Sequence, residues 1–280
     1  MAKSVSIVAL VVGLSMGPCI AVAADDDADD EATTRPIVSI DLSTVYASAP
    51  GFGFSFGLPR LSSAVLSAPT SKSLTVDVPL KIEFNDRFFI YAGIFGSTQK
   101  LGSGPWSSFQ VDAWRTGFSA DIVQQQGAIP TVTLTGSVSR PFDRAGTLFK
   151  TTTWSTGLDL DRALDAEETF GLLAGASVTA VTVDRDLLTI RPTSIFYVGG
   201  YRQFDDWKLT GQLGVQHFGG AQFAGIIDLR PATMPFVRFE AERLDEDDNR
   251  LLAVSAAFGW SSSKLAMQLT LNVPIYLYGR

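Results

Sequence analysis

Residues 73–84 read SLTVDVPLKIEF, and every second one of them is apolar. The apolar positions are Leu74, Val76, Val78, Leu80, Ile82 and Phe84. Because successive side chains of a β-strand point to opposite faces, this segment predicts a strand with one apolar face and one polar face. Two kinds of fold use such strands: a soluble sandwich with a dry core, and a closed barrel that turns its apolar face to lipid.

The same alternation recurs along most of the chain. It occurs at 38–46, 87–95, 109–122, 132–138, 154–160, 172–180, 195–201, 207–216, 223–229, 235–243, 252–260 and 265–275. Segment 52–56 is short and rich in glycine, and 61–72 reads as a loop. Counting from Ser73 gives about twelve predicted strands, or about fourteen if 38–46 and 52–56 also pair. Connection lengths read from the sequence do not separate one end of the sheet from the other.

A closed barrel accounts for this pattern better than a sandwich. A sandwich would require two or more domains in a chain of this length, yet no linker rich in Pro, Gly or Ser divides the strand region. No segment after the N-terminus approaches the roughly eighteen apolar residues of a membrane helix. Aromatic residues gather near predicted strand ends, as in an interfacial girdle, and include Phe88, Phe89, Trp106, Trp207, Trp260, Tyr276 and Tyr278. We predict an all-β fold, a closed antiparallel up-and-down transmembrane β-barrel of about twelve strands, within a range of about ten to fourteen.

The N-terminus has the features of a removable export signal. Lys3 is followed by an apolar run, the helix breaker Pro18, and small residues at Ala21 and Ala23 that fit a cleavage site. We assign 1–23 to a signal peptide, 24–35 to an acidic disordered leader and 36–280 to the barrel, with 36–72 left open as lying outside the regular barrel. The only cysteine, Cys19, falls within the signal peptide and lacks a lipidation motif.

Charge and residue usage exclude several functions. The formal net charge is -7 and the leader contains DDDADDE at 25–31, so the chain is a poor nucleic-acid binder. A processed chain without cysteine and with the single histidine His217 offers neither disulfides nor a thiolate or histidine metal centre. We therefore expect no metal, no cofactor and no catalytic residue.

Over nearly its whole processed length the chain resembles the transmembrane β-barrels of Gram-negative outer membranes. The resemblance lies in the export signal, the absence of cysteine, the repeated alternation and a final amphipathic strand with Leu269, Leu271, Val273, Ile275 and Leu277. In that class the last strand usually ends on an aromatic residue, whereas this chain continues from Tyr278 to Arg280. The resemblance implies location in the bacterial outer membrane. It also implies lipid, lipopolysaccharide, small solutes and the barrel-assembly machinery as partners.

Charged residues on the polar faces are the candidate functional residues. Isolated charges in a dry interior are costly, so these groups require water or close pairing. We predict that six of them line the lumen: Asp77, Lys81, Glu83, Arg238, Glu240 and Glu242. Asp112 and Arg115 lie three residues apart, so both face inward only if a β-bulge interrupts their strand.

A barrel of about twelve strands encloses a lumen wider than the filled eight-stranded kind and narrower than that of general porins. A narrow channel for small solutes is therefore the favoured function. Two alternatives remain: a lipid-modifying enzyme with His217 as general base, although no serine lies close to it in the sequence, and a sealed structural or adhesive barrel. The acidic segment 245–249 lacks the spacing of an EF-hand and is predicted to be a solvated turn.

Overall fold

The computed structural model describes residues 36–49, 70–142, 150–184, 188–223, 227–246, 249–261 and 264–278. The predicted signal peptide, the acidic leader and segment 52–56 lie outside the described residues. Within the described ranges, no helix has the length and apolarity needed to cross a membrane.

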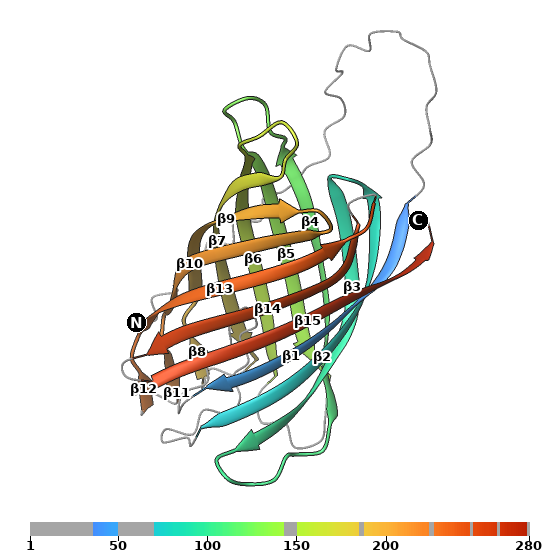
Figure 1. Cartoon of the computed structure of the whole chain (residues 1–280). Coiled ribbons are helices and arrows are strands. Elements are labelled where there is room, and N and C mark those ends of the chain that lie inside the picture. Colours follow the sequence, from blue (N-terminus) through green and yellow to red (C-terminus); the bar gives the residue numbers. More distant parts are fainter. Residues whose placement is uncertain are drawn as a thin grey trace, which may run out of the picture. The chain divides into compact units, whose positions relative to one another are not determined.

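Twelve strands of the described residues close into one antiparallel barrel (Figure 1). They are β1 (Ile37–Ala49), β2 (Ser71–Asn85), β3 (Phe88–Leu101), β4 (Gln110–Val123), β5 (Thr131–Pro141), β6 (Thr151–Ala163), β7 (Phe170–Val183), β9 (Thr193–Phe204), β10 (Trp207–Phe218), β13 (Ala232–Leu244), β14 (Arg250–Ser261) and β15 (Lys264–Tyr278). Each barrel strand pairs with the preceding and following ones, and β1 pairs with β15 to close the barrel. The predicted fold class and strand number are confirmed.

Three short strands form a separate sheet at one end of the barrel, with the order β12-β11-β8. They are β8 (Leu188–Ile190), β11 (Ala221–Phe223) and β12 (Ile227–Leu229), and they belong to the connections β7–β9 and β10–β13 (Figure 1). The prediction of a barrel strand at 223–229 is therefore wrong, because three-residue strands are far shorter than the roughly nine residues of a membrane crossing. The twelfth barrel strand is β1, between β15 and β2.

The connections between barrel strands sort by length into two ends. At the end where β1 begins and β15 finishes, here called the terminus end, they are 86–87, 124–130, 164–169, 205–206 and 245–249. At the opposite end, here called the loop end, they are 50–70, 102–109, 142–150, 184–192, 219–231 and 262–263. The longer connections thus gather at the loop end, an asymmetry that the sequence had not revealed. The assignment of each connection to an end depends on which segments cross the barrel, so the asymmetry is visible only when β1 is included and segment 223–229 is left out.

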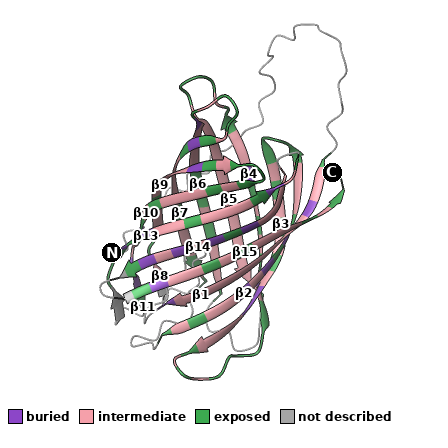
Figure 2. Ribbon diagram, viewed as in Figure 1, coloured by how far each residue is buried: buried purple, intermediate pink, exposed green. Residues whose placement is uncertain are grey.

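The apolar faces of the strands are turned outward. Val198, Leu213 and Phe239, on β9, β10 and β13, are 61%, 62% and 59% exposed. Leaving such side chains in water forgoes up to about 1.5–3 kcal/mol each, whereas hydrocarbon accommodates them. Figure 2 shows exposed positions recurring along the strands, with few buried ones between them. The outer surface is therefore suited to a bilayer.

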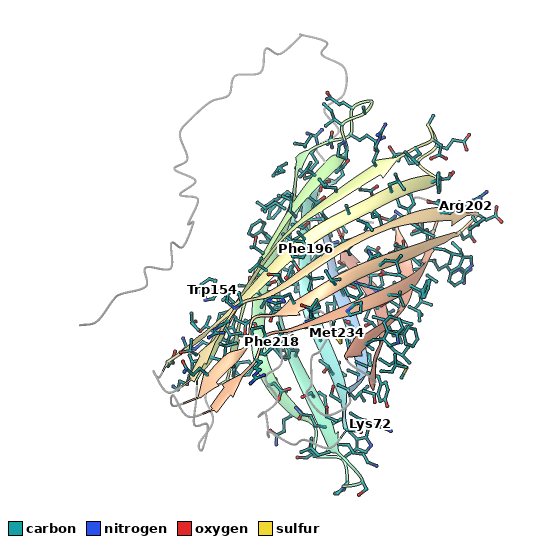
Figure 3. All side chains as sticks on the ribbon, turned by 90° about the vertical axis from the view of Figure 1, so that its left-hand side faces the viewer. Lys72, Trp154, Phe196, Arg202, Phe218 and Met234 are labelled. Carbon is teal, nitrogen blue, oxygen red and sulfur yellow. The ribbon has the colours of Figure 1, made fainter. Side chains whose placement is uncertain are left out.

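Exposed aromatic side chains mark the borders of this surface. Near the terminus end they are Phe84, Phe88, Phe170, Phe204 and Trp207; toward the loop end they are Phe109, Trp154 and Trp260. In Figure 3, Trp154 and Arg202 stand at the edge of the barrel wall toward opposite ends. Girdles of aromatic side chains at both borders are typical of the two interfaces of a membrane barrel.

Candidate functional site

The six predicted lumen residues all lie on the inward face of two strands. On β2, exposed Val78 and Leu80 point outward, so alternation directs Asp77, Lys81 and Glu83 to the interior. On β13, Phe239 points outward in the same way. The inward residues there are Arg238, Glu240 and Glu242.

Ion pairs connect these residues to one another and to two further arginines. Lys81 Nζ lies 2.5 Å from Glu83 Oε1, and Arg238 Nη2 lies 2.7 Å from Glu240 Oε2. Two pairs cross between strands: Asp77 with Arg115 of β4, and Glu242 Oε1 with Arg250 Nη2 of β14 at 2.6 Å. Asp77 is nearly buried, with 4% of its side chain exposed, which matches its ion pair with Arg115. The sequence did not indicate Arg250, because its partner lies across a turn whose register is irregular.

A β-bulge brings Asp112 into the same interior. The register of β3 and β4 shifts between Phe95 and Gly96, where Asp112 is the additional residue of β4. Ser97 Oγ donates a hydrogen bond to Asp112 Oδ2 at 2.5 Å, while Arg115 reaches Asp77. The bulge therefore permits both Asp112 and Arg115 to face inward, as their spacing required.

Two tyrosine–aspartate pairs form a second luminal cluster, on β6 and β9. Tyr197 Oη donates a hydrogen bond to Asp159 Oδ1 at 2.6 Å, and Tyr201 is hydrogen-bonded to Asp161. Both bonds pass over β7, the strand between β6 and β9. A Cβ added to Gly175 would collide with Asp159 and the ring of Tyr197. The glycines of β7 are what let the tyrosines lie along the wall.

Sequence reasoning missed this cluster, although a signal for it exists. Asp159 and Asp161 share one face of a strand, as do Gly171 with Gly175 and Tyr197 with Tyr201. The three pairs lie on the consecutive barrel strands β6, β7 and β9. The strand register places each glycine of β7 beside a tyrosine of β9, and Gly175 also beside Asp159 of β6. The register between β7 and β9 depends on a connection that contains β8, so the alignment could not be read from the sequence alone.

Hydroxyl groups cover the wall from β5 to β7. Inward positions there are Thr131, Thr133, Thr135, Ser137, Ser139, Thr153, Ser155, Ser177 and Thr179. Thr133 Oγ1 donates a hydrogen bond to Asp121 Oδ1 at 2.6 Å, and Ser155 and Thr179 are joined at 3.1 Å. This wall can hydrogen-bond to water or to a polar solute without carrying charge.

Charge is distributed unequally around the lumen. The inward cations with described side chains are Lys81, Arg115, Lys208, Arg238 and Arg250, and four of them are ion-paired with Glu83, Asp77, Glu240 and Glu242. The remaining inward carboxylates include Asp41, Asp121, Asp159 and Asp161. Asp121 and Asp159 accept hydrogen bonds from the hydroxyl groups of Thr133 and Tyr197. A neutral hydroxyl does not cancel the negative charge of a carboxylate, whereas an ion-paired cation does. The described lumen therefore carries more carboxylates than cations.

Several polar atoms inside the barrel require water. Asp41 Oδ1 and Arg250 Nε are buried and have no hydrogen-bond partner among the described residues. An unmatched buried polar or charged group costs several kcal/mol in a dry environment, on the order of 2–7 for an amide or hydroxyl. Ordered water is the usual partner of such buried polar groups, which fits the polar inner face of this barrel.

Two other candidates from the sequence lie outside this luminal site. His217 is an outward, exposed residue of β10, and its Nδ1 lies 2.9 Å from Thr233 Oγ1 on the neighbouring strand. The turn after β13 is closed by Asp245, whose Oδ1 accepts a hydrogen bond of 2.8 Å from the backbone N–H of Asn249. No group of three metal-ligating side chains occurs among the described residues.

Comparisons with known proteins yield structural likeness but no sequence family. No protein-family model and no curated protein matches the chain. An outer membrane channel from Pseudomonas putida F1 superposes with a TM-score of 0.54 at 12% identity, covering 89% of this chain and 99% of that one. The translocator domain of autotransporter NalP from Neisseria meningitidis gives 0.48 at 11% identity, with 87% and 88% covered. A Pseudomonas aeruginosa FadL homologue gives 0.43 at 11% identity, with 87% and 90% covered.

The fold is that of a Gram-negative outer-membrane β-barrel. The likeness to the Pseudomonas putida channel extends over nearly the whole described barrel, so the two chains share their overall architecture. At 12% identity it carries no residue-level correspondence. The chemistry of the lumen must be argued from this chain's own side chains.

Proposed function

We propose that this protein is an outer-membrane channel that passes small solutes and prefers cations. The observation that carries the proposal is the composition of the lumen, where four of the five described cations are ion-paired and further carboxylates accept hydrogen bonds from hydroxyl groups. A pore wall with excess negative charge raises the local concentration of cations and repels anions. The hydroxyl wall of β5 to β7 adds neutral hydrogen-bonding groups along the same path.

The proposed orientation places the terminus end in the periplasm and the loop end outside the cell. Short turns on the periplasmic side and longer extracellular loops are typical of these barrels, and the assembly machinery acts from the periplasm. The connections of this chain sort in that way.

Lipopolysaccharide is the lipid partner that we propose for the loop end. Lys72 and Lys100 lie directly opposite each other on outward positions of β2 and β3, and neither has an ion-pair partner among the described residues (Figure 3, Lys72). Like charges in such a pair are destabilising unless an anion lies between them, and the phosphates of lipopolysaccharide fit that need. The double variant K72A/K100A should retain less lipopolysaccharide on purification, and unchanged retention would contradict the assignment.

Planar-bilayer electrophysiology tests the channel directly. The refolded barrel, checked by its shift on unheated gels, should give discrete conductance steps in KCl. Under a KCl gradient the reversal potential should have the sign for K⁺ preference. A folded barrel without current would favour the sealed alternative, and an anion-selective current would overturn the role given to the luminal carboxylates.

A further inference from the structure

An aromatic ring, a cation and a carboxylate occur together repeatedly in the lumen. Beside the turn of β2 and β3, Lys81 Nζ lies 4.1 Å from the centroid of the Phe89 ring and 2.5 Å from Glu83 Oε1. The cation is held on one side by the negative face of the ring and on the other by the carboxylate. Such contacts are favourable when the cation is partly removed from water.

The same arrangement recurs twice. Arg115 Cζ lies 5.3 Å from the Tyr91 centroid and is ion-paired with Asp77. Lys208 Nζ lies 4.1 Å from the centroid of the Tyr201 ring. The Tyr201 hydroxyl is hydrogen-bonded to Asp161, and the positive charge of Lys208 attracts the same carboxylate. Both a lysine ammonium and an arginine guanidinium thus fit this pattern of luminal groups.

Tyr197 and Asp159 form the same ring and carboxylate without the cation. Their oxygens are 2.6 Å apart, and both residues are half-buried on the inward faces of β9 and β6. Among the described residues no lysine or arginine lies over the Tyr197 ring or is ion-paired with Asp159. Arg238 acts on Tyr197 through space, but its guanidinium is paired with Glu240.

We propose that Tyr197 and Asp159 bind the ammonium or guanidinium group of an organic cation as it passes through the lumen. This inference rests on the proposed channel function and names the solute class of that channel. The solute's cationic group would take the place that Lys208 or Lys81 occupies in the complete sets. An inorganic K⁺ ion holds its hydration shell and gains less from the ring, so the site discriminates between the two kinds of cation.

Neighbouring groups support a solute at this point. Along the hydrogen-bonded row, Asp121, Thr133, Asp159, Gly175 and Tyr197 lie on consecutive strands from β4 to β9. Because Gly175 has no side chain, nothing projects from β7 between the carboxylate and the ring. Asp121 and Thr133 can accept the remaining N–H groups of an ammonium or guanidinium.

Current block in the planar bilayer tests the proposal. Guanidinium chloride and methylammonium chloride, added separately to one side, should interrupt the K⁺ current of the wild-type channel. In Asp159→Asn and Tyr197→Leu the concentration for half block should rise by about tenfold. Tyr197→Phe keeps the ring and should lose less. The matched control is Asp41→Asn, a luminal carboxylate of β1 that lies outside this row, and its half-block concentration should change by less than about twofold.

The outcomes separate this inference from the channel function on which it rests. If the folded wild-type barrel passes no current, the channel function fails. If K⁺ current flows but neither organic cation interrupts it, the channel function stands and the Tyr197–Asp159 site is wrong. Equal loss of block in Asp41→Asn and Asp159→Asn would also overturn the site, because general electrostatics would then explain the block.

Discussion

The outward and inward faces of β10 belong to the same short segment and have opposite chemistry. Leu213 is 62% exposed on the outside, whereas its neighbour Gln212 points inward between Gly199 and Arg238. In a protein surrounded by water, a leucine as exposed as Leu213 would be unfavourable. The contrast is resolved if the two faces meet two solvents, hydrocarbon outside and water inside.

This comparison explains why the barrel has no apolar core of the usual kind. Most buried apolar residues of the described chain are alanines, as at Ala113, Ala253 and Ala257. Stability then comes from the closed hydrogen-bonded ladder and from the lipid, while the inner surface remains free to carry charge and hydroxyl groups. Polar function and an apolar exterior are thus compatible on a single layer of strands.

The largest effect is expected from placing one charge on either face. Leu213→Arg should destabilise the barrel in phospholipid vesicles by roughly 2–4 kcal/mol, because the charge enters the hydrocarbon near the middle of its strand. Gln212→Arg should cost less than about 1 kcal/mol, since its side chain meets lumen water. Urea unfolding followed by tryptophan fluorescence measures both. Equal destabilisation by the two substitutions would break the comparison.

A methyl group on an inward or an outward glycine gives the next largest effect. In Gly175→Ala the new Cβ would collide with Asp159 and the Tyr197 ring, so we expect a loss of roughly 1–3 kcal/mol. In Gly211→Ala the nearest atom is Phe239 Cδ1 at 4.0 Å, an ordinary contact. The unfolding free energy of Gly211→Ala should therefore differ from that of the wild type by less than about 0.5 kcal/mol. A harmless Gly175→Ala would mean that the tyrosine does not lie over β7.

Neutralising luminal carboxylates tests whether the charge of the inner face sets the selectivity between K⁺ and Cl⁻. The triple variant D121N/D159N/D161N should lower the ratio of K⁺ to Cl⁻ permeability by about threefold or more. The double variant K81M/E83Q removes one cation and one carboxylate together and should leave that ratio nearly unchanged. Reversal potentials in a KCl gradient measure both variants. If K81M/E83Q lowered the permeability ratio as much as the triple variant does, net luminal charge would not set the selectivity.

The smallest effect concerns a turn outside the barrel wall. Thr169 donates its hydroxyl and backbone N–H to Asp165, and the Phe170 N–H donates at 2.9 Å. These hydrogen bonds hold the pKa of the Asp165 carboxyl below its ordinary value of 3.8. Because the folded pKa is the lower one, the bonds stabilise the turn above the ordinary value and are lost as pH falls through the folded value.

Amide exchange in that turn measures the effect. At neutral pH, Thr169 and Phe170 should exchange more slowly in the wild type than in Asp165→Asn. The difference should vanish once the pH lies well below the folded pKa of Asp165, where both side chains are neutral. A difference that persists in acid would show that the turn does not depend on the ionised carboxylate.

The fold could be predicted from the sequence because a period of two is a local property. The predicted number of twelve is nevertheless correct only because two errors compensate: segment 223–229 is not a barrel strand, and segment 38–46, which lies outside the count from Ser73, is one. Alternation over so few residues does not distinguish a membrane crossing from the short strands β11 and β12. Length between turns is the better criterion.

The candidate site was predictable only in part, for a related reason. Alternation assigns Asp77 and Glu240 to the polar face, but their partners are fixed by register and by bulges. The partner of Asp77 is Arg115, two strands away, and the bulge at Asp112 shifts that alignment. The pairing of Tyr197 with Asp159 spans β7 in the same way. Contacts across an intervening strand depend on the whole sheet.

Spin-label accessibility at two adjacent positions tests the central claim most directly. Because Cys19 is the only cysteine and lies in the predicted signal peptide, Leu213→Cys and Gln212→Cys each provide one labelling site in the processed chain. In phospholipid vesicles the label at 213 should be relaxed mainly by molecular oxygen, which concentrates in hydrocarbon. The label at 212 should be relaxed mainly by a water-soluble nickel complex. Equal access of the nickel complex to both labels would contradict the account.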